Sequence, residues 1–366
     1  MLIFNMKNKG ERSMINTLMV GVDNERVGGM WTVAETFIKD KSFNQRVKLY
    51  YVATSTGGTK TKRIKKMLEG YFKILVILIS KKVDIVHIHM AERGSVYRKG
   101  FVIRLAKLFN KKIIVQMHAG PILAWYNGLT ENRKKRVAKI LNNADKVLVL
   151  GEYWKNQMTT IIDGSKIDIL YNGAECPEKN LYNANGEIIL HMGVLKKTKG
   201  TYDLVDAIKL IDDKLPNNEK IFLCGVDETG EVKKYVEKCN LKDRVVMTGW
   251  IDKNRRLEFF KNTKICVLPS YFEALSMTVI ESMCYGIPMI TTDISTMGEL
   301  LGNEIERVKP GDIKKLADLI LKLSGNLELR KRISEIEYHR AKEKFSVTII
   351  MKKTIEIYNE LFQMNN

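Results

Sequence analysis

The sequence predicts an α/β protein built from two doubly wound, Rossmann-like domains that follow one another along the chain. Short apolar runs alternate with longer amphipathic stretches from residue 15 to the end. This alternation is typical of parallel sheets covered by helices on both faces. One stretch, residues 171–187, interrupts the pattern and is rich in Asn and Gly. We interpret it as a linker between two domains, for which 366 residues are sufficient.

The first half contains five apolar runs that predict strands, separated by amphipathic runs that predict helices. The strand-like runs are INTLMVGV, VKLYYVAT, VDIVHIHM, KKIIVQMH and KVLVLG. The helix-like runs include VAETFIKD, RKGFVIRLAKLFN and ENRKKRVAKILNN. We expect these elements to form a domain at residues 15–175, preceded by a disordered extension or a misplaced start at residues 1–14.

The second half repeats the same alternation. Its strand-like runs are EIILHMGV, KIFLCG, VVMTGW, KICVLPS and PMITTD, and the amphipathic run FSVTIIMKKTIEIYNELFQ closes the chain. We expect a second domain at residues 176–345 and a C-terminal helix at residues 346–366.

Composition and cysteine use indicate an ordinary globular protein of the cytoplasm. Hydrophobic residues make up 45% and charged residues 28% of the chain. The longest unbroken apolar run, ILVILI at residues 74–79, is far shorter than the ~20 residues of a membrane-spanning helix, and the N-terminal apolar run is too short for a signal peptide. The cysteines are odd in number and form no CxxC, which predicts free buried thiols and no structural zinc site. They are Cys176, Cys224, Cys239, Cys266 and Cys284.

Positive charge is concentrated in the first half of the chain. Residues 1–175 hold 31 Lys and Arg against 14 Asp and Glu, whereas residues 176–366 hold 30 against 28. This asymmetry predicts an anionic partner for the first domain. The segment KTKRIKKMLEGYFKI combines basic and apolar residues, which favours docking on an anionic membrane surface, although a merely solvated face is the alternative. The basic residues expected to contact it are Lys62, Arg63, Lys65 and Lys66.

Ligands of parallel sheets bind outside the carboxyl ends of the strands, and two motifs of the first half lie there. Gly28 and Gly29 follow the first strand and precede a predicted helix, so backbone amides there can approach an anion. The alternative is a simple turn, and the spacing is not the GxGxxG of dinucleotide sites. His118 follows a later strand, which favours a functional over a structural histidine.

The second half has a basic loop in the same position. Gly193 follows a predicted strand, three lysines come next, and Gly200 opens a helix. Lysines and helix-end amides suit a diphosphate. The loop does not match the P-loop pattern, and a solvated basic loop is the alternative. The lysines are Lys196, Lys197 and Lys199.

Glu273 and Glu281 are the acidic residues that most clearly indicate a site. The stretch PSYFEALSMTVIESMCYGIP places Glu273 after a strand and Glu281 inside the following helix, which Gly286 closes. A buried carboxylate without partners is costly, and the hydroxyls of a sugar are suitable partners.

Together these motifs resemble the retaining glycosyltransferases of family 4, which have the two-domain GT-B fold. The strongest elements of the resemblance are E-ALSMTVI-E and G-VLKKT-KG, and it covers the chain from Ile15 to the end. It implies a nucleotide-sugar donor, UDP- or GDP-linked, held mainly by the second domain in a cleft between the domains. It implies no cofactor and no metal, and no Asp-x-Asp metal clamp is visible.

The resemblance also implies roles for individual residues. Glu273 would bind the hydroxyls of the transferred sugar, Glu281 the ribose, and Lys199 the diphosphate. His118 would lie beside the reacting sugar. The other residues implied to approach the donor are Gly28, Gly29, Gly193, Lys196, Lys197, Ser270, Leu275, Ser276 and Met277.

The chain departs from the family pattern at two positions, and its acceptor is open. Val194 stands where the family has Arg, and Ala274 stands where it has Gly. From the basic first domain we expect a lipid-linked glycan acceptor and peripheral attachment to the inner face of the cell membrane. The alternative is a soluble small-molecule acceptor. No helix-turn-helix, zinc or RNP-like motif supports nucleic-acid binding.

Overall fold

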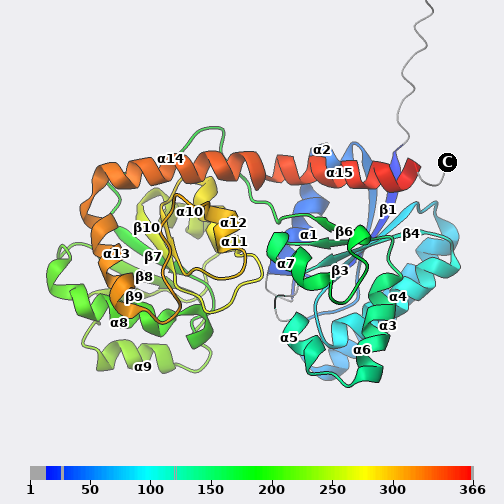
Figure 1. Ribbon diagram of the computed structural model, residues 1–366, viewed down its shortest axis with the longest axis horizontal. Helices are drawn as coiled ribbons and strands as arrows, with labels where there is room; N and C mark the ends of the chain where they lie inside the picture. The colour runs from blue at the N-terminus through cyan, green and yellow to red at the C-terminus, as the bar shows by residue number, and fades with distance from the viewer. Residues whose placement is uncertain (1–13, 26–28, 119, 121, 364–366) are drawn as a thin grey trace, which may run out of the picture. The chain divides into compact units, whose positions relative to one another are not determined.

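The structure is a computed structural model that describes residues 14–25, 29–118, 120 and 122–363 (Figure 1). The expected extension, apart from residue 14, and Gly28 lie outside the described residues. Both predicted sheets are present, so the α/β fold class with two doubly wound sheets is confirmed.

The first sheet has the strand order β2-β1-β3-β4-β5-β6. β1 pairs in parallel with β2 on one side and with β3 on the other, so the strand order reverses between β1 and β3. In open α/β sheets ligands bind at such a reversal. The strands are β1 (Ile15–Gly21), β2 (Val47–Ala53), β3 (Ile85–Met90), β4 (Lys112–Met117), β5 (Lys146–Val149) and β6 (Ile167–Ile169).

Helices connect these strands, as the amphipathic runs predict. They are α1 (Gly29–Lys39), α2 (Lys41–Asn44), α3 (Lys60–Ser80), α4 (Gly94–Leu108), α5 (Ile122–Asn127), α6 (Glu131–Asn142) and α7 (Glu152–Met158), with a short 3-10 turn η1 (Gly164–Lys166) before β6.

The long helix α3 lies unusually close to the sheet at one point. The hydroxyl of Thr59 caps its first turn by accepting a hydrogen bond from the Lys62 amide, at 3.3 Å. A Cβ on Gly70 would come within 2.7 Å of the Ala53 carbonyl oxygen, so glycine permits this approach. The side of α3 that faces the sheet is narrow, and its buried residues are Gly70, Ile74 and Leu78.

The second sheet has the strand order β11-β10-β7-β8-β9 and is parallel. The chain runs from β7 outward through β8 and β9, then returns to pair β10 with the other side of β7. The reversal therefore falls between β7 and β10. The strands are β7 (Ile188–Met192), β8 (Lys220–Cys224), β9 (Val245–Met247), β10 (Thr263–Leu268) and β11 (Met289–Thr291).

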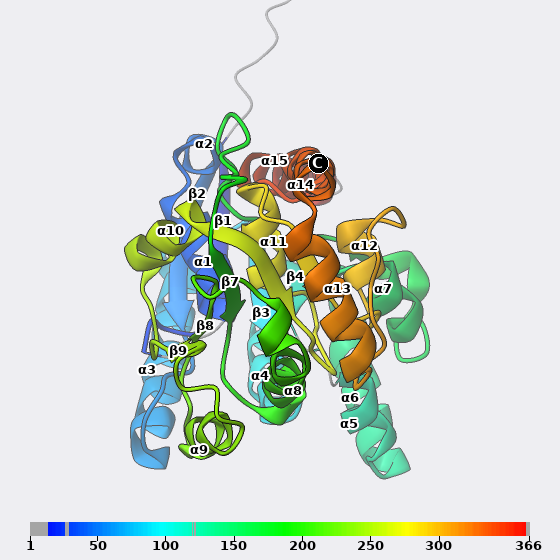
Figure 2. The ribbon, with the colours of Figure 1, turned by 90° about the vertical axis from the view of Figure 1, so that its left-hand side faces the viewer.

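The helices that follow β7 along the chain are α8 (Thr201–Ile211), α9 (Glu231–Lys238), α10 (Lys253–Lys261), α11 (Met277–Cys284), α12 (Met297–Leu301), α13 (Ile313–Gly325), α14 (Leu327–Lys344) and α15 (Val347–Gln363), with 3-10 turns η2 (Lys197–Lys199) and η3 (Asp212–Lys214). Of these, α8 and α13 pack side by side (Figure 2), and most of the last helix, α15, belongs to the same compact unit as β1, β2 and β3 rather than to the second sheet.

The chain divides into two compact units. The first comprises Met1–Gln116, Lys135–Val147 and Met351–Asn366, and the second comprises Met117–Lys134 and Leu148–Ile350. The domain bounds expected at residues 175 and 345 stay a prediction.

The C-terminal helix contributes to the first unit through Tyr358. Its hydroxyl lies 2.6 Å from Nδ1 of His87, and both side chains are fully buried. The ring of His87 also stacks on that of His89, with centroids 4.9 Å apart. Both histidines of β3 are therefore packed into the core of this unit.

Two expectations from the sequence need correction. Cys176 and Cys284 form a disulfide across 108 residues of sequence, so the prediction of free thiols is wrong for these two. Cys224, Cys239 and Cys266 are free and buried. The short strand β6 was also missed, because three residues with one buried position carry little periodic signal.

Candidate functional site

The candidate site lies at the carboxyl ends of β7 and β10, where the strand order of the second sheet reverses. Gly193 follows β7, and the turn from Pro269 to Ser276 follows β10. The amide of Tyr271 donates to the carbonyl oxygen of Thr198, at 3.0 Å. This bond joins the turn after β10 to the lysine loop after β7, so two distant motifs of the sequence form one site.

Glu273 is held by two donors at the centre of this site. Its carboxylate oxygen Oε1 accepts from the Lys199 ammonium at 2.5 Å and from the Ser270 hydroxyl at 2.8 Å. Glu273 is 7% exposed, and the Lys199 side chain is 26% exposed. Both described bonds end on Oε1, so the lone pairs of Oε2 can accept from the hydroxyls of a ligand.

Hydroxyl groups from the segment after β11 fix the turn that carries Glu273. Ser295 donates to the carbonyl oxygen of Glu273 at 2.8 Å, and Thr296 donates to that of Ala274 at 3.2 Å. Thr292 donates to the carbonyl oxygen of Ser270. With its backbone oxygens bonded in this way, the turn presents the Glu273 carboxylate in one orientation.

Two glycines allow the backbones to come together here. Gly200 has φ of 67°, and a Cβ there would lie 2.0 Å from the Pro269 carbonyl oxygen. Gly193 has φ of 143°, and a Cβ there would meet no atom within 4 Å. Gly200 is thus required by packing within the protein. Gly193 borders open space, where a ligand can approach the backbone.

His191 supports the lysine loop from inside the sheet. Its Nδ1 donates to the Val267 carbonyl oxygen at 2.9 Å, and its Nε2 accepts from the Thr201 hydroxyl at 3.2 Å. Thr201 in turn accepts from the Lys196 amide at 3.2 Å. Burial lowers the pKa of His191 to about 4, so the ring stays neutral and keeps this donor and acceptor arrangement at physiological pH.

Glu281 lies in α11, whose first turn is capped by Ser276. The Ser276 hydroxyl accepts from the Val279 amide at 3.4 Å. Burial raises the pKa of the Glu281 carboxyl, while the Arg256 guanidinium, 2.9 Å away, lowers it. Arg256 comes from α10 and is a site residue that the sequence did not reveal, because its pairing depends on how α10 packs beside α11.

His118 lies just beyond β4 and is half-buried. Two residues later, a Cβ on Gly120 would come within 2.3 Å of the Phe272 ring and 3.2 Å of the Ala274 Cβ. Gly120, two residues after His118, therefore packs against the turn that carries Glu273.

The comparisons with known proteins agree with this geometry. Residues 172–340 match the model of glycosyl transferases group 1, and residues 35–176 match that of glycosyltransferase family 4. An uncharacterized glycosyltransferase of Methanocaldococcus jannaschii is 28% identical over 296 residues, covering 78% of each chain. The capsular polysaccharide biosynthesis glycosyltransferase CapM of Staphylococcus aureus is 27% identical over 266 residues, covering 71% of this chain and 66% of CapM.

Solved structures show the same fold. HepE of Anabaena, in complex with UDP and glucose, superposes with a TM-score of 0.74 at 15% identity, covering 94% of this chain and all of that one. The protein is a glycosyltransferase of the GT-B fold.

Trp154 is a second residue of this glycosyltransferase that sequence analysis missed. Its indole N–H donates to the Ala274 carbonyl oxygen at 2.6 Å, and its ring lies 6.2 Å from that of Phe272. Glu299 holds the same helix, α7, by accepting from the amides of Glu152 at 2.8 Å and Tyr153 at 2.9 Å. A tryptophan in a short helix carries no sequence signal for this role.

The remaining site predictions belong to other parts of the chain. Gly29 is the first residue of α1. Lys62 and Lys66, expected at a membrane, pair with Glu25 at 2.5 Å and Asp23 at 3.2 Å. The residues that the structure describes contain no cluster of three or more His, Cys, Asp or Glu side chains that could hold a metal ion.

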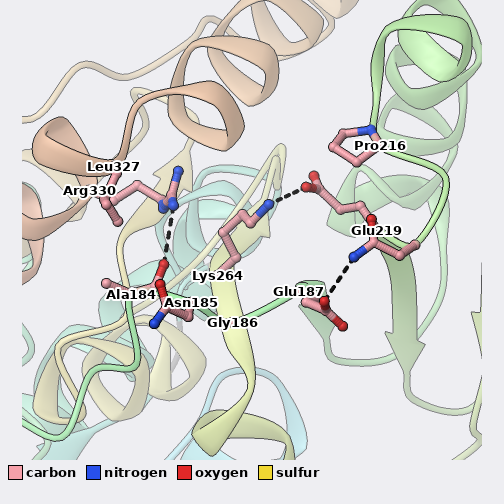
Figure 3. Close-up of a pocket in the computed structure, with 10 residues that line it drawn as sticks. Ala184, Asn185, Gly186, Glu187, Pro216, Glu219, Lys264, Leu327 and Arg330 are labelled. Atoms are coloured by element: carbon pink, nitrogen blue, oxygen red, sulfur yellow. Dashed lines mark hydrogen bonds and ion pairs between the residues drawn. The ribbon is translucent and has the colours of Figure 1, made fainter.

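The opposite ends of the same strands hold a second polar cluster (Figure 3). Lys264 and Glu219 point toward each other and form an ion pair, and the Ser324 hydroxyl donates to Glu219 at 2.7 Å. Arg330 donates to the carbonyl oxygens of Leu323 at 2.7 Å and Ala184 at 3.2 Å. These groups border a cavity of about 290 Å³ but satisfy one another, which indicates a structural role.

Proposed function

We propose that this glycosyltransferase moves a sugar from a nucleoside diphosphate sugar to a hydroxyl of a glycan acceptor, with retention of configuration at the anomeric carbon. The observation that carries this proposal is the bonding of Glu273 to Lys199 and Ser270 at the reversal of the second sheet. A carboxylate fixed on one oxygen suits the hydroxyls of the transferred sugar. The partly exposed ammonium of Lys199 beside it suits the diphosphate.

The proposed reaction breaks the bond between the anomeric carbon and the diphosphate oxygen and forms one to the acceptor oxygen on the same face. The acceptor proton passes to the departing phosphate oxygen, so no protein nucleophile is needed. Lys196, Lys197 and Lys199, with the N-terminal amides of α8, supply positive charge as the diphosphate departs. Glu281, next to Arg256, accepts from the ribose hydroxyls.

A panel of nucleotide sugars tests this function. The full-length protein is incubated with UDP-, GDP- and ADP-linked sugars and candidate glycan acceptors, and release of nucleoside diphosphate is measured. We expect the wild-type protein to release nucleoside diphosphate from one donor class. The Glu273→Ala variant should lose this activity. Wild-type rates in the Glu273→Ala variant would show that the sugar site lies elsewhere.

We further propose that the reaction needs no metal ion. The three lysines of the donor loop carry the positive charge that a divalent cation would otherwise supply. In excess EDTA we expect the transfer rate to stay within about twofold of its value without EDTA. A twofold change corresponds to about 0.4 kcal/mol in the activation free energy. Loss of activity that magnesium or manganese restores would contradict this assignment.

We propose that α3 docks the enzyme on an anionic membrane that carries the acceptor. Among the residues that the structure describes, no helix combines the length and the apolar character of a membrane span. The side of α3 away from the sheet exposes a continuous apolar stripe, which is unusual for a solvated helix. Its members are Ile64, Leu68, Phe72, Leu75, Val76 and Ile79, and Phe101 of α4 extends it.

Charge on the same helix favours a lipid surface over another apolar partner. Phe72 is 69% and Ile79 is 68% exposed, and lysines and arginines flank the stripe. Each basic residue near an anionic bilayer contributes about 1 kcal/mol. Because Lys62 and Lys66 are paired with acids, we expect Lys65 to contribute more than these two. The likeness to CapM, named for capsular polysaccharide biosynthesis, supports a glycan acceptor.

Co-sedimentation with vesicles tests the docking surface. We expect binding to phosphatidylglycerol vesicles at low salt and little binding to phosphatidylcholine. A Leu68→Gln/Phe72→Gln variant should lose it. The matched control, Leu181→Gln/Leu210→Gln, changes two exposed leucines of the second unit and should bind normally. If the stripe variant instead separates a dimer and leaves vesicle binding intact, the stripe is a contact between two copies.

A further inference from the structure

A cavity in the first unit lies where the strand order of the first sheet reverses. Its volume is about 530 Å³, within the roughly 300–1,000 Å³ typical of small-molecule sites. Val22, Thr54 and Ala91, which line it, follow the carboxyl ends of β1, β2 and β3 respectively. The cavity thus has the position in the first sheet that the Glu273 site has in the second.

The lining of this cavity is strongly basic. Among the described residues, five basic side chains and one acidic side chain, Glu92, border it. Three of the basic side chains form no ion pair with another described residue, and they are Lys60, Arg63 and Arg93. The other two are Arg98 and Lys99.

Lys99 is the most informative of these side chains because it is only 1% exposed. Its ammonium donates to the Gly21 carbonyl oxygen at 3.1 Å, at the end of β1. Placing an ammonium group in the interior is costly, and a nearby anion offsets part of that cost. A buried lysine bordering a cavity is therefore better suited to an anionic ligand than to a neutral one.

Neutral donors at the same cavity suit the same kind of ligand. The N-terminal residues of α3 and α4 border it through Lys60 and Gly94. These helices have 21 and 15 residues, so each brings the positive end of its dipole to the cavity. Ser55 adds a hydroxyl.

We propose that this cavity binds a phosphate or diphosphate group of the acceptor. The inference rests on the proposed function and gives the acceptor a chemical class, an anionic sugar derivative rather than a neutral glycan. Several cations and oriented amides in one cavity match the multiple oxygens of a phosphate ester. The phosphate can belong to a lipid carrier or to a soluble sugar phosphate, and both present the same group.

Binding of inorganic pyrophosphate tests the site without requiring turnover. The experiment uses the full chain with the substitution Lys199→Gln, which is chosen to weaken pyrophosphate binding at the donor loop. The affinity for pyrophosphate is measured by calorimetry. Adding Lys60→Gln and Arg63→Gln should weaken binding by at least about tenfold, or 1.4 kcal/mol. The control Lys73→Gln/Lys81→Gln removes two exposed charges near the same helix but outside the cavity and should leave affinity unchanged. Equal affinity in both double variants would overturn the proposal.

Two further probes identify the source of the phosphate. One arm uses glucose 6-phosphate, and the other uses phosphatidylcholine vesicles that carry a polyprenyl diphosphate. If Lys60→Gln/Arg63→Gln weakens the binding of either probe, the site is supported, and the probe that responds identifies the source of the phosphate. If the binding of neither probe changes in this variant, the acceptor assignment is overturned. Nucleoside diphosphate binding, measured in parallel, should be unaffected by this pair. If no sugar is transferred yet pyrophosphate binding responds as expected, the proposed function fails and the anion site stands.

Discussion

Two lysine–glutamate pairs lie at opposite ends of the same sheet and differ in how their carboxylates are used. Lys264 lies near the start of β10 and pairs with Glu219, whereas Lys199 pairs with Glu273 just beyond the end of β10. Both carboxylates are buried, at 1% and 7% exposure. The same two residue types therefore pair at similar burial at both edges of the sheet.

The difference lies in which carboxylate oxygens are bonded. Glu219 uses both, since Ser324 donates to Oε1 and Lys264 donates to Oε2. Glu273 receives Lys199 and Ser270 on Oε1 alone. A pair that satisfies itself stabilises the fold, whereas a pair with an oxygen open to a ligand is suited to binding. The two pairs can be separated by experiments on stability and on turnover.

The largest effect is expected on stability, from Lys264→Met. This change leaves the Glu219 carboxylate buried without its ammonium, and breaking a buried pair in this way costs about 3–5 kcal/mol. Urea unfolding measures the loss. The control Lys220→Met removes a lysine that bonds only the exposed carbonyl oxygen of Asp243 and should cost under about 1 kcal/mol. An unchanged midpoint for Lys264→Met would show that the pair is not structural.

The next largest effect is expected on turnover, from Glu273→Gln. Glutamine keeps the shape but weakens the interaction with the donor sugar and with Lys199. We expect turnover to fall by about a hundredfold or more, the size typical of losing one preorganised polar contact at a transition state. Nucleoside diphosphate affinity should stay within about threefold, or 0.7 kcal/mol.

The paired control for that experiment is Glu219→Gln. It should lower the unfolding midpoint and leave turnover of the folded enzyme nearly unchanged. If Glu273→Gln lowered stability as much as Glu219→Gln and kept wild-type turnover, the distinction between the two carboxylates would be wrong.

The contrast also shows what sequence could reveal. Lys199 and Glu273 were predicted to belong to one site because each follows a strand, and parallel strands bring their carboxyl ends to one edge; the ion pair between them comes from the structure. Strand-end positions do not predict the pairing of Lys264 with Glu219, because Lys264 lies within β10 and Glu219 precedes β8. Arg256 and Trp154 were missed for the same reason, since helix packing places them.

Tertiary packing explains the other differences. The disulfide joins Cys176 and Cys284, which are 108 residues apart, and spacing alone does not determine such a pair. Within the apolar run at residues 74–79, only Ile74 and Leu78 are buried. Gly70 allows the helix to approach β2 closely, and the apolar residues on the other side of the helix are exposed.

The smallest effect is expected from the two exposed lysines of the donor loop. Val194 stands at the position where the glycosyltransferases that the chain resembles have arginine. Lys196 and Lys197 follow two and three positions later. If either supplies the missing charge to the diphosphate, Lys196→Glu or Lys197→Glu should raise the Kd of the nucleoside diphosphate by about tenfold, equivalent to 1.4 kcal/mol.

This last prediction is measured by calorimetry at low and high salt, because a charge contact at an exposed loop weakens as the Debye length falls from about 10 Å at 0.1 M to about 3 Å at 1 M. The control Lys238→Glu reverses an exposed charge on α9 and should change affinity little. If neither loop variant differs from it, phosphate binding rests on Lys199 and the amides at the start of α8. Glu273 and the diphosphate would then share one ammonium, and Lys199→Gln should impair both donor affinity and turnover.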